Sequence, residues 1–140
     1  MATPNACDAE ALVRGVRRCV GTLPPDESGA MLAAALSAVN ENNAASRGLA
    51  KVLRAEAKRH NSAKAADAFA MAGGAAAAVA AVNCYFRGPP EPVKAATDSV
   101  AALADLAAAG GAARAAVIEA GAADSVVLVL VRNSNEVENL

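Results

Sequence analysis

The sequence predicts an all-α fold, and three features of it support that prediction. Hydrophobic residues make up 55% of the 140 residues but aromatic residues only 2%, so the core must be built from small side chains with helices close together. Alanine, which is abundant along the whole chain, heads the scale of helix propensity. Residues that favour sheets are scarce outside the segment 126–131. A chain of this length is expected to form one domain around one core.

The net charge and the cysteines of the chain argue against several kinds of partner and bound group. The formal charge of −1 favours neither nucleic acid nor an acidic membrane surface. The three cysteines share no short metal-ligand spacing, so they indicate no zinc site and no disulfide framework, and they fit a reduced intracellular compartment. The most apolar stretch, 68–82, is mostly alanine and contains two glycines, so we expect no membrane span. No motif calls for a metal or a cofactor.

A pair of helices broken by glycine occurs twice. The segment 67–82 aligns with 115–130 at a shift of 48, which places Gly73 on Gly121. After each glycine, apolar residues follow the spacing of one helical face. These residues are Ala75, Ala78, Val79 and Val82 in the first copy, and Ala123, Val126, Val127 and Leu130 in the second. A fainter third copy, at a shift of 44, consists of Gly29, Met31, Ala34, Ala35 and Ala38. Such periods are typical of helical solenoids.

Three longer helices are expected around these copies. The segment 42–60 can begin at Asn42 or Asn43 and turns four apolar residues inward, namely Ala45, Leu49, Val52 and Leu53. The segment 91–110 carries a core stripe of Val93, Ala96, Val100, Leu103 and Ala107. The segment 7–20 is expected to have Asp8 as its N-cap and an inward face of Leu12, Val16, Cys19 and Val20. Pro24 and Pro25 predict no helix in the segment 21–29, which ends at Gly29.

These segments together resemble the armadillo repeat. The segment 113–140, ARAAVIEAGAADSVVLVLVRNSNEVENL, is similar to the first helix of that family, its glycine hinge, its second helix and the N-x-E-V entry into the third. The segment 101–121 is similar to the junction between a third and a first helix, with Leu103, Asp105 and Leu106 on the family's ALxNLA pattern. HEAT-type helix pairing is the nearest alternative, and three helices per unit favour armadillo.

The resemblance is good over 61–140, fair over 29–60 and absent before that. It implies an armadillo-like right-handed α-solenoid of about two to three repeats with an N-terminal capping helix. The expected single domain, 1–140, consists of an N-terminal cap and loop (1–28), two repeats (29–72 and 73–120) and an incomplete repeat (121–140).

In armadillo proteins the third helices line a concave groove that grips extended peptides, so by resemblance two rows of residues would face a partner. The first row is Arg47, Lys51, Arg54 and Lys58, whose spacing places four cations within about 60° of arc. The second row is Lys94, Asp98, Ala101 and Asp105, where the sign of the charge has largely reversed. A solvated helix face would explain either row without a binding function.

The resemblance therefore implies a protein-interaction scaffold or adaptor without catalysis of its own. It would be cytoplasmic or nuclear and would bind a protein or peptide of mixed charge. The chain has no Trp, and Ala101 and Asp105 stand where the family's best-known peptide readers hold Trp and Asn, so a nuclear-import receptor of the usual kind is not expected. One alternative is a structural remnant of a larger repeat protein that only stacks and self-associates through an open C-terminal edge. Another is a regulatory subunit of an enzyme that uses Cys84 or His60, although His60 is expected at a solvated helix end.

Overall fold

The computed structural model describes residues 6–39, 43–87, 93–109, 111–125 and 127, with side chains described for all of these except 6–8, 43, 84–87 and 93–97. The described residues form helices and no strand, which confirms the all-α prediction. The elements are α1 (Ala6–Val20), α2 (Pro25–Ala38), α3 (Asn43–Arg59), α4 (Ala63–Phe69), the π-helical turn η1 (Ala70–Gly74), α5 (Ala75–Arg87), α6 (Val93–Ala108) and α7 (Gly111–Glu119).

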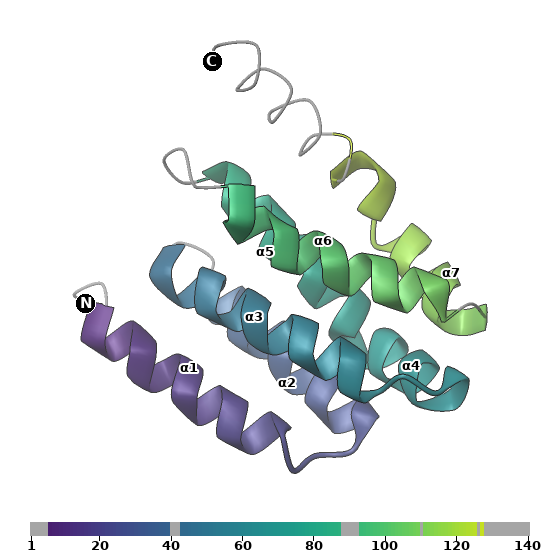
Figure 1. Cartoon of the computed structure of the whole chain (residues 1–140), viewed down its shortest axis with the longest axis horizontal. Helices are drawn as coiled ribbons and strands as arrows, with labels where there is room; N and C mark the ends of the chain where they lie inside the picture. Colours follow the sequence, from purple (N-terminus) through teal and green to yellow (C-terminus); the bar gives the residue numbers. More distant parts are fainter. Residues whose placement is uncertain (1–5, 40–42, 88–92, 110, 126, 128–140) are drawn as a thin grey trace.

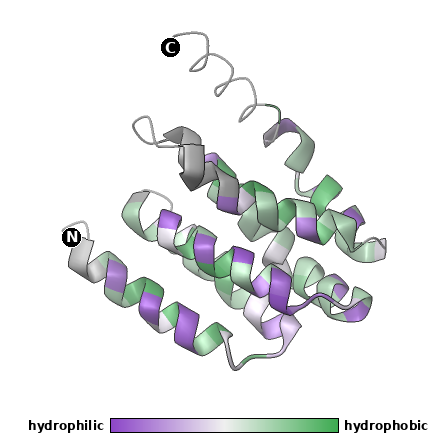
Figure 2. Ribbon diagram, in the orientation of Figure 1, coloured by the Kyte–Doolittle hydropathy of each residue, from purple (hydrophilic) through white to green (hydrophobic). Residues whose placement is uncertain are grey.

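The longer helices form two layers (Figure 1). Helices α1, α3 and α6 lie side by side and run in the same direction, while α2 and α5 lie behind them and run the opposite way. Hydrophilic residues occur along the side of α1 and α3 that faces the viewer in Figure 2. The largest buried side chains between the elements belong to Leu32, Leu36, Leu49, Leu53, Phe69 and Leu106.

Glycine allows α2 to approach the bend between α4 and α5 very closely. Gly73 has φ +139°, a conformation that L side chains rarely adopt, and a Cβ there would lie 2.9 Å from the Ala33 Cβ. A Cβ on Gly29 of α2 would overlap the carbonyl oxygen of Phe69, and a Cβ on Gly74 would overlap the Phe69 ring. The absence of these three side chains is what lets the fully buried Phe69 ring fit beside α2.

The two predicted hinges both have a positive φ but differ in their surroundings. Gly121 has φ +86° and follows α7, as Gly73 follows α4, so both glycines are hinges as the sequence predicts. A Cβ on Gly121 would meet nothing within 4 Å, whereas Gly73 is pressed against α2. The second copy therefore repeats the bend without repeating its packing.

The start of α2 differs from the prediction. The helix begins at Pro25, with Pro24 in the extended conformation at its N-cap, because the first turn of a helix does not need the N–H that proline lacks. The expectation of no helix before Gly29 is therefore wrong, and the expected boundary after residue 28 lies inside α2. Gly29 is a helical contact residue rather than a hinge. The face predicted from the faint copy is also wrong, because Ala34 and Ala38 are exposed.

The predicted inner face is confirmed for α3 and is rotated for α1 and α6. All four predicted core residues of α3 are buried. In α1 the buried residues are Ala9, Val13 and Val20, whereas Cys19 and Leu12 are exposed. Asp8 lies inside α1 rather than at its cap. In α6, Ala102, Leu103 and Leu106 are buried, and Val100 and Ala107 are half-buried; the side chains of Val93 and Ala96 lie outside the described set. The buried faces of α1 and α6 differ from the predicted ones because the neighbouring helix decides which face is buried. Alanine fits equally well on a buried or an exposed face, so it does not indicate the face.

The predicted core face after Gly121 is wrong where the structure describes it. Ala122 and Ser125 are buried, whereas Ala123 and Val127 are exposed, Val127 to 55%. Ile118 of α7 is 69% exposed, although its counterpart in the first copy, Ala70, is buried. Val126 and Leu130 lie outside the described residues. No helix of the described part of the chain covers this apolar edge.

One stretch of the described residues, Ala63–Asn83, is long and apolar enough to cross a bilayer by length and composition alone. It comprises α4, η1 and most of α5, and 56% of its most apolar window is buried inside the fold. Its residues pack against α2, α3 and α6.

Two helical glycines provide a matched test of the close approach. Gly29→Ala should lower the free energy of unfolding by about 1–3 kcal/mol, because the new methyl group overlaps the Phe69 carbonyl. Gly15→Ala should raise it by about 0.5–1 kcal/mol, because nothing lies within 4 Å of that position and alanine favours the helix. Urea denaturation measures both variants. Equal effects of the two substitutions would contradict the packing described for α2.

Candidate protein-binding groove

The two predicted rows lie on neighbouring helices, α3 and α6 (Figure 1). Arg47, Lys51 and Lys58 are exposed and Arg54 is half-buried, so the basic row does follow one outward face of α3. The row on α6 is mixed, because Asp98 is buried, Ala101 is half-buried and Asp105 is exposed. The side chain of Lys94 lies outside the described set.

Arg54 and Asp98 bind each other instead of facing a partner. Arg54 Nη1 donates to Asp98 Oδ1 at 2.8 Å, and the Asp98 side chain is only 12% exposed. Asp98 is therefore not available to a partner's cation, and its prediction as an acidic groove residue is wrong. The physical reason is the adjacency of α3 and α6, which brings together two residues 44 positions apart. The ion pair fixes the relative position of the two helices.

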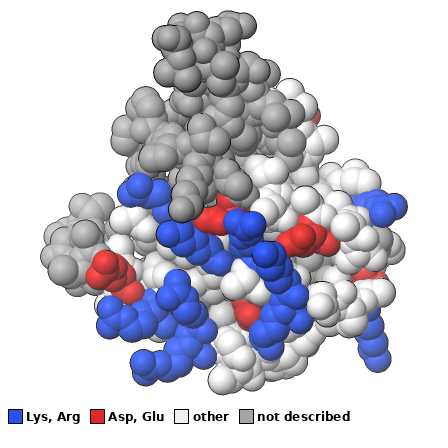
Figure 3. All heavy atoms as spheres, in the orientation of Figure 1, with Lys and Arg blue, Asp and Glu red and all other residues white. Residues whose placement is uncertain are grey.

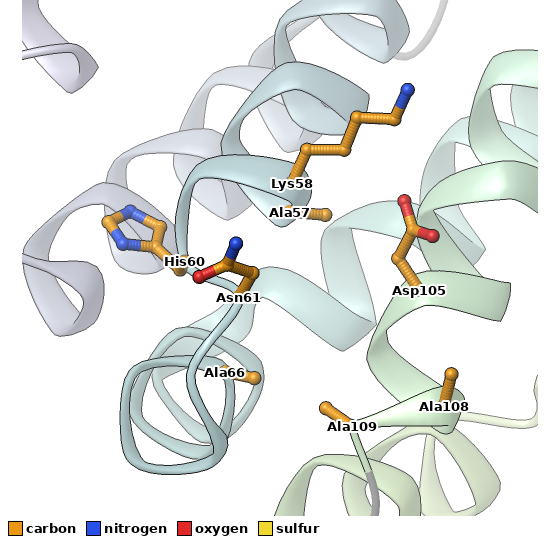
Figure 4. A pocket seen from close by; sticks show the side chains of 8 residues that line it. All are labelled: Ala57, Lys58, His60, Asn61, Ala66, Asp105, Ala108 and Ala109. Carbon is orange, nitrogen blue, oxygen red and sulfur yellow. The ribbon is translucent and has the colours of Figure 1, made fainter.

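A pocket of about 490 Å³ lies between the C-terminal ends of α3 and α6 (Figure 4). Its walls are methyl groups of Ala57, Ala66, Ala108 and Ala109, with Lys58, Asp105, Asn61 and His60 completing the lining. Figure 4 shows the Lys58 and Asp105 side chains extending toward the same opening from α3 and α6. Among the described residues neither has an ion-pair partner within 4.0 Å. The pocket thus combines one cation, Lys58, and one anion, Asp105, with the methyl groups of four alanines.

Basic side chains also gather beyond the predicted rows. Figure 3 shows Lys and Arg concentrated over α1 and α3 on this face of the molecule. On α1 they are Arg14, Arg17 and Arg18, all of them exposed. The prediction omitted them because α1 was expected to act only as a cap. Their spacing on one helix, three and four residues apart, was the available signal.

His60 belongs to a buried polar network, so its prediction as a solvated helix-end residue is wrong. It is 5% exposed, its Nε2 lies 3.1 Å from Ser28 Oγ, and its ring packs against Phe69. The buried Glu56 accepts two hydrogen bonds from Arg59, at 2.6 and 2.8 Å. Arg59 Nη2 also donates to the carbonyls of Val20 and Leu23. The network therefore fastens the α1–α2 connection to the end of α3.

Ser28, His60 and Glu56 do not have the geometry of a nucleophilic triad. In such a triad the acid and the nucleophile contact opposite ring nitrogens of the histidine. Here the same nitrogen, His60 Nε2, lies 3.1 Å from Ser28 Oγ and 3.8 Å from Glu56 Oε1. Ser28 is also fully buried, out of reach of a substrate. The arrangement supports a structural role for these three side chains.

Asp67 joins α4 to α7. Its Oδ1 accepts a hydrogen bond of 2.7 Å from the backbone N–H of Ala113, in the first turn of α7. The left-handed Gly111, φ +56°, lets the chain turn beside this carboxylate, which a Cβ there would meet at 3.5 Å. A carboxylate at a helix N-terminus satisfies an unpaired N–H and complements the helix dipole.

The Arg54–Asp98 pair can be tested against a matched acid on the same helix. Asp98→Ala should lower the free energy of unfolding by about 1–2 kcal/mol, because it leaves a half-buried guanidinium without its partner. Asp105→Ala should change it by less than about 0.5 kcal/mol, because Asp105 is exposed. Urea denaturation of the two variants makes the comparison. A cost at Asp105 as large as at Asp98 would overturn the assignment.

The buried His60 should make stability depend on pH. Burial lowers the pKa of His60 below its usual 6.5, and the nearby Arg59 lowers it further, while Glu56 opposes both. Because the folded state takes up this proton less readily than the unfolded state, the stabilisation is complete above about pH 6.5 and is lost as pH falls toward the lowered pKa.

His60 is the only histidine of the chain, so one substitution isolates its titration. Between pH 7.5 and 5.5 the urea midpoint should fall more for the native chain than for His60→Gln. The same fall in both proteins would assign the pH dependence to other groups.

Comparison with models of known protein families, with curated proteins and with solved structures finds no match to this chain.

Proposed function

We propose that the chain is a protein-interaction module that binds an extended segment of a partner protein across the layer formed by α1, α3 and α6. The fold would be an armadillo-like right-handed α-solenoid of about two to three repeats. Three features support this. The layers run in opposite directions, α4, α5 and α6 make one unit of three helices, and a left-handed glycine follows the first helix of each copy.

The outer surface of α3 and α6, which would form the binding groove, supports the proposal most strongly. Lys51 and Lys58 are exposed on α3, and the Arg54–Asp98 ion pair joins α3 to α6. The alanine-lined pocket lies at the C-terminal end of the two helices. The pocket lies within the range of about 300–1,000 Å³ that accommodates small ligands or a side chain. A partner would place acidic residues against Lys51 and Lys58, and a basic residue against Asp105. Such a protein would work in the cytoplasm or nucleus, where the exposed Cys19 stays reduced.

A second role, stacking alone, is favoured by the apolar edge at α7. Ile118 and Val127 are both more than half exposed, and exposed side chains of this kind commonly mark contacts between proteins. A chain with only this role would assemble with other copies and would bind no peptide in the groove.

Selection of binding peptides from a random phage-displayed library tests the two roles. The affinity of selected peptides, measured by fluorescence anisotropy, should fall at least tenfold in Lys51→Glu/Lys58→Glu, because the groove then repels acidic residues. The control is Lys64→Glu, an exposed cation on α4 outside the groove.

Arg54 is left unchanged in this test, since its loss would also release Asp98. Unchanged affinity in the double variant would refute the groove. Failure to enrich any peptide, together with assembly that grows with concentration in light scattering, would favour the stacking role.

A further inference from the structure

We propose that α1 forms part of the binding surface and that the partner segment is acidic, with carboxylates about every third residue. This inference rests on the proposed function and narrows its partner from mixed charge to acidic. Its surface, the basic surface, consists of five exposed cations of α1 and α3, namely Arg14, Arg17, Arg18, Lys51 and Lys58.

Helix α1 belongs to the same layer as α3 and α6 (Figure 1). It packs against α3, where a Cβ on Gly48 would collide with the Val13 side chain, and it runs in the same direction as α3 and α6 (Figure 1). Helix α1 therefore extends the layer by one helix instead of closing its end. An apolar hollow of about 550 Å³ lies on its other side, lined by Leu12, Val16 and Cys19 with Met31 of α2. Helical spacing puts Arg14 and Arg17 on the side away from that hollow.

The charges of this layer that remain for a partner are mostly cations. The two acids that the fold buries among α3 and α6 are already engaged, since Asp98 binds Arg54 and Glu56 binds Arg59. No carboxylate of the described residues forms an ion pair with the three arginines of α1 or with Lys51 and Lys58. Figure 3 shows the resulting concentration of Lys and Arg over these two helices. Two exposed acids among the described side chains lie on the same layer, Glu10 of α1 and Asp105 of α6, so the five cations of the basic surface outnumber them and favour an anionic partner.

The distance between the helices sets the spacing of the partner's charges. Packed helices lie about 8–10 Å apart. A peptide in the polyproline II conformation advances about 3.1 Å per residue and returns every third side chain to the same side. A peptide that crosses the layer therefore moves from α1 to α3 in about three residues, and carboxylates at that interval would meet both helices.

A nucleic acid is the other anionic partner to consider, and two observations favour the peptide. The whole chain has a formal charge of −1. In addition, α1 and α3 contain no aromatic residue on which bases could stack. Recognition by cations alone, on a chain that is neutral overall, suits a short acidic segment better than a long polyanion.

Fluorescence anisotropy with a labelled twelve-residue peptide of repeated Asp-Ser-Ala units tests the inference. The native chain should bind it, more weakly at 0.5 M than at 0.05 M salt, and should not bind the matching Lys-Ser-Ala peptide. Arg14→Gln/Arg17→Gln should weaken binding at least fivefold. The matched control, Lys64→Gln/Arg114→Gln, neutralises two exposed cations on α4 and α7 and should bind like the native chain. Circular dichroism confirms that each variant is folded.

The outcomes separate the inference from the proposed function. If the α1 variant binds normally while Lys51→Glu/Lys58→Glu does not, the groove stands and the role of α1 is refuted. If phage-selected peptides bind but the acidic peptide does not, the acidic partner is refuted and the groove again stands. Tighter binding of a single-stranded oligonucleotide than of the peptide would refute the peptide partner. Failure of both the acidic and the selected peptides would refute both proposals.

Discussion

The close approach of α2 to the bend at Gly73 is the constraint on which the rest of the structure depends. In a chain with few large side chains, helices can bury enough surface only if their backbones come near each other. The three glycines at this crossing remove the methyl groups that would hold the helices apart, and Phe69 occupies the space so defined. Because α2 and α5 form the rear layer, this one contact also sets where α3 and α6 lie in front.

Polar contacts fix the relative positions of the helices, which packing between small apolar side chains does not determine. Alanine surfaces are smooth, so they specify the distance between helices better than their relative position. Arg54 with Asp98, Arg59 with Glu56 and two carbonyls, and Asp67 with the N-terminus of α7 each join elements distant in sequence. A half-buried ion pair adds little net stability because its charges must lose water, but it disfavours any other register. We infer that these contacts specify the arrangement while the apolar core supplies the stability.

The sequence predicted helices and hinges better than it predicted faces. The core residues of α3 were correct because Leu49, Val52 and Leu53 are the bulkiest apolar side chains on that helix. The faces of α1 and α6 were rotated, since alanine surrounds both and leaves the choice to the neighbouring helix. In the candidate groove the basic row was correctly placed on one face, because helical spacing alone determines it. The engagement of Asp98 and the burial of His60 could not be predicted, since each depends on a partner, Arg54 or Ser28, that only the fold brings near.

A chain of nearly zero net charge presents a basic face here because its charges are unevenly distributed. Each internal pair engages one arginine and one acid, so it leaves the total charge unchanged. Within the described part of the chain, the basic surface holds five cations against two exposed acids of the same layer, Glu10 and Asp105, while Asp26, Glu27, Glu119 and Asp124 are exposed on other elements. At physiological ionic strength charges are screened beyond about 8 Å, so a partner senses mainly the charges nearest to it. Selectivity for an acidic segment would consequently arise at contact, from the positions of individual cations, rather than from the field of the whole molecule.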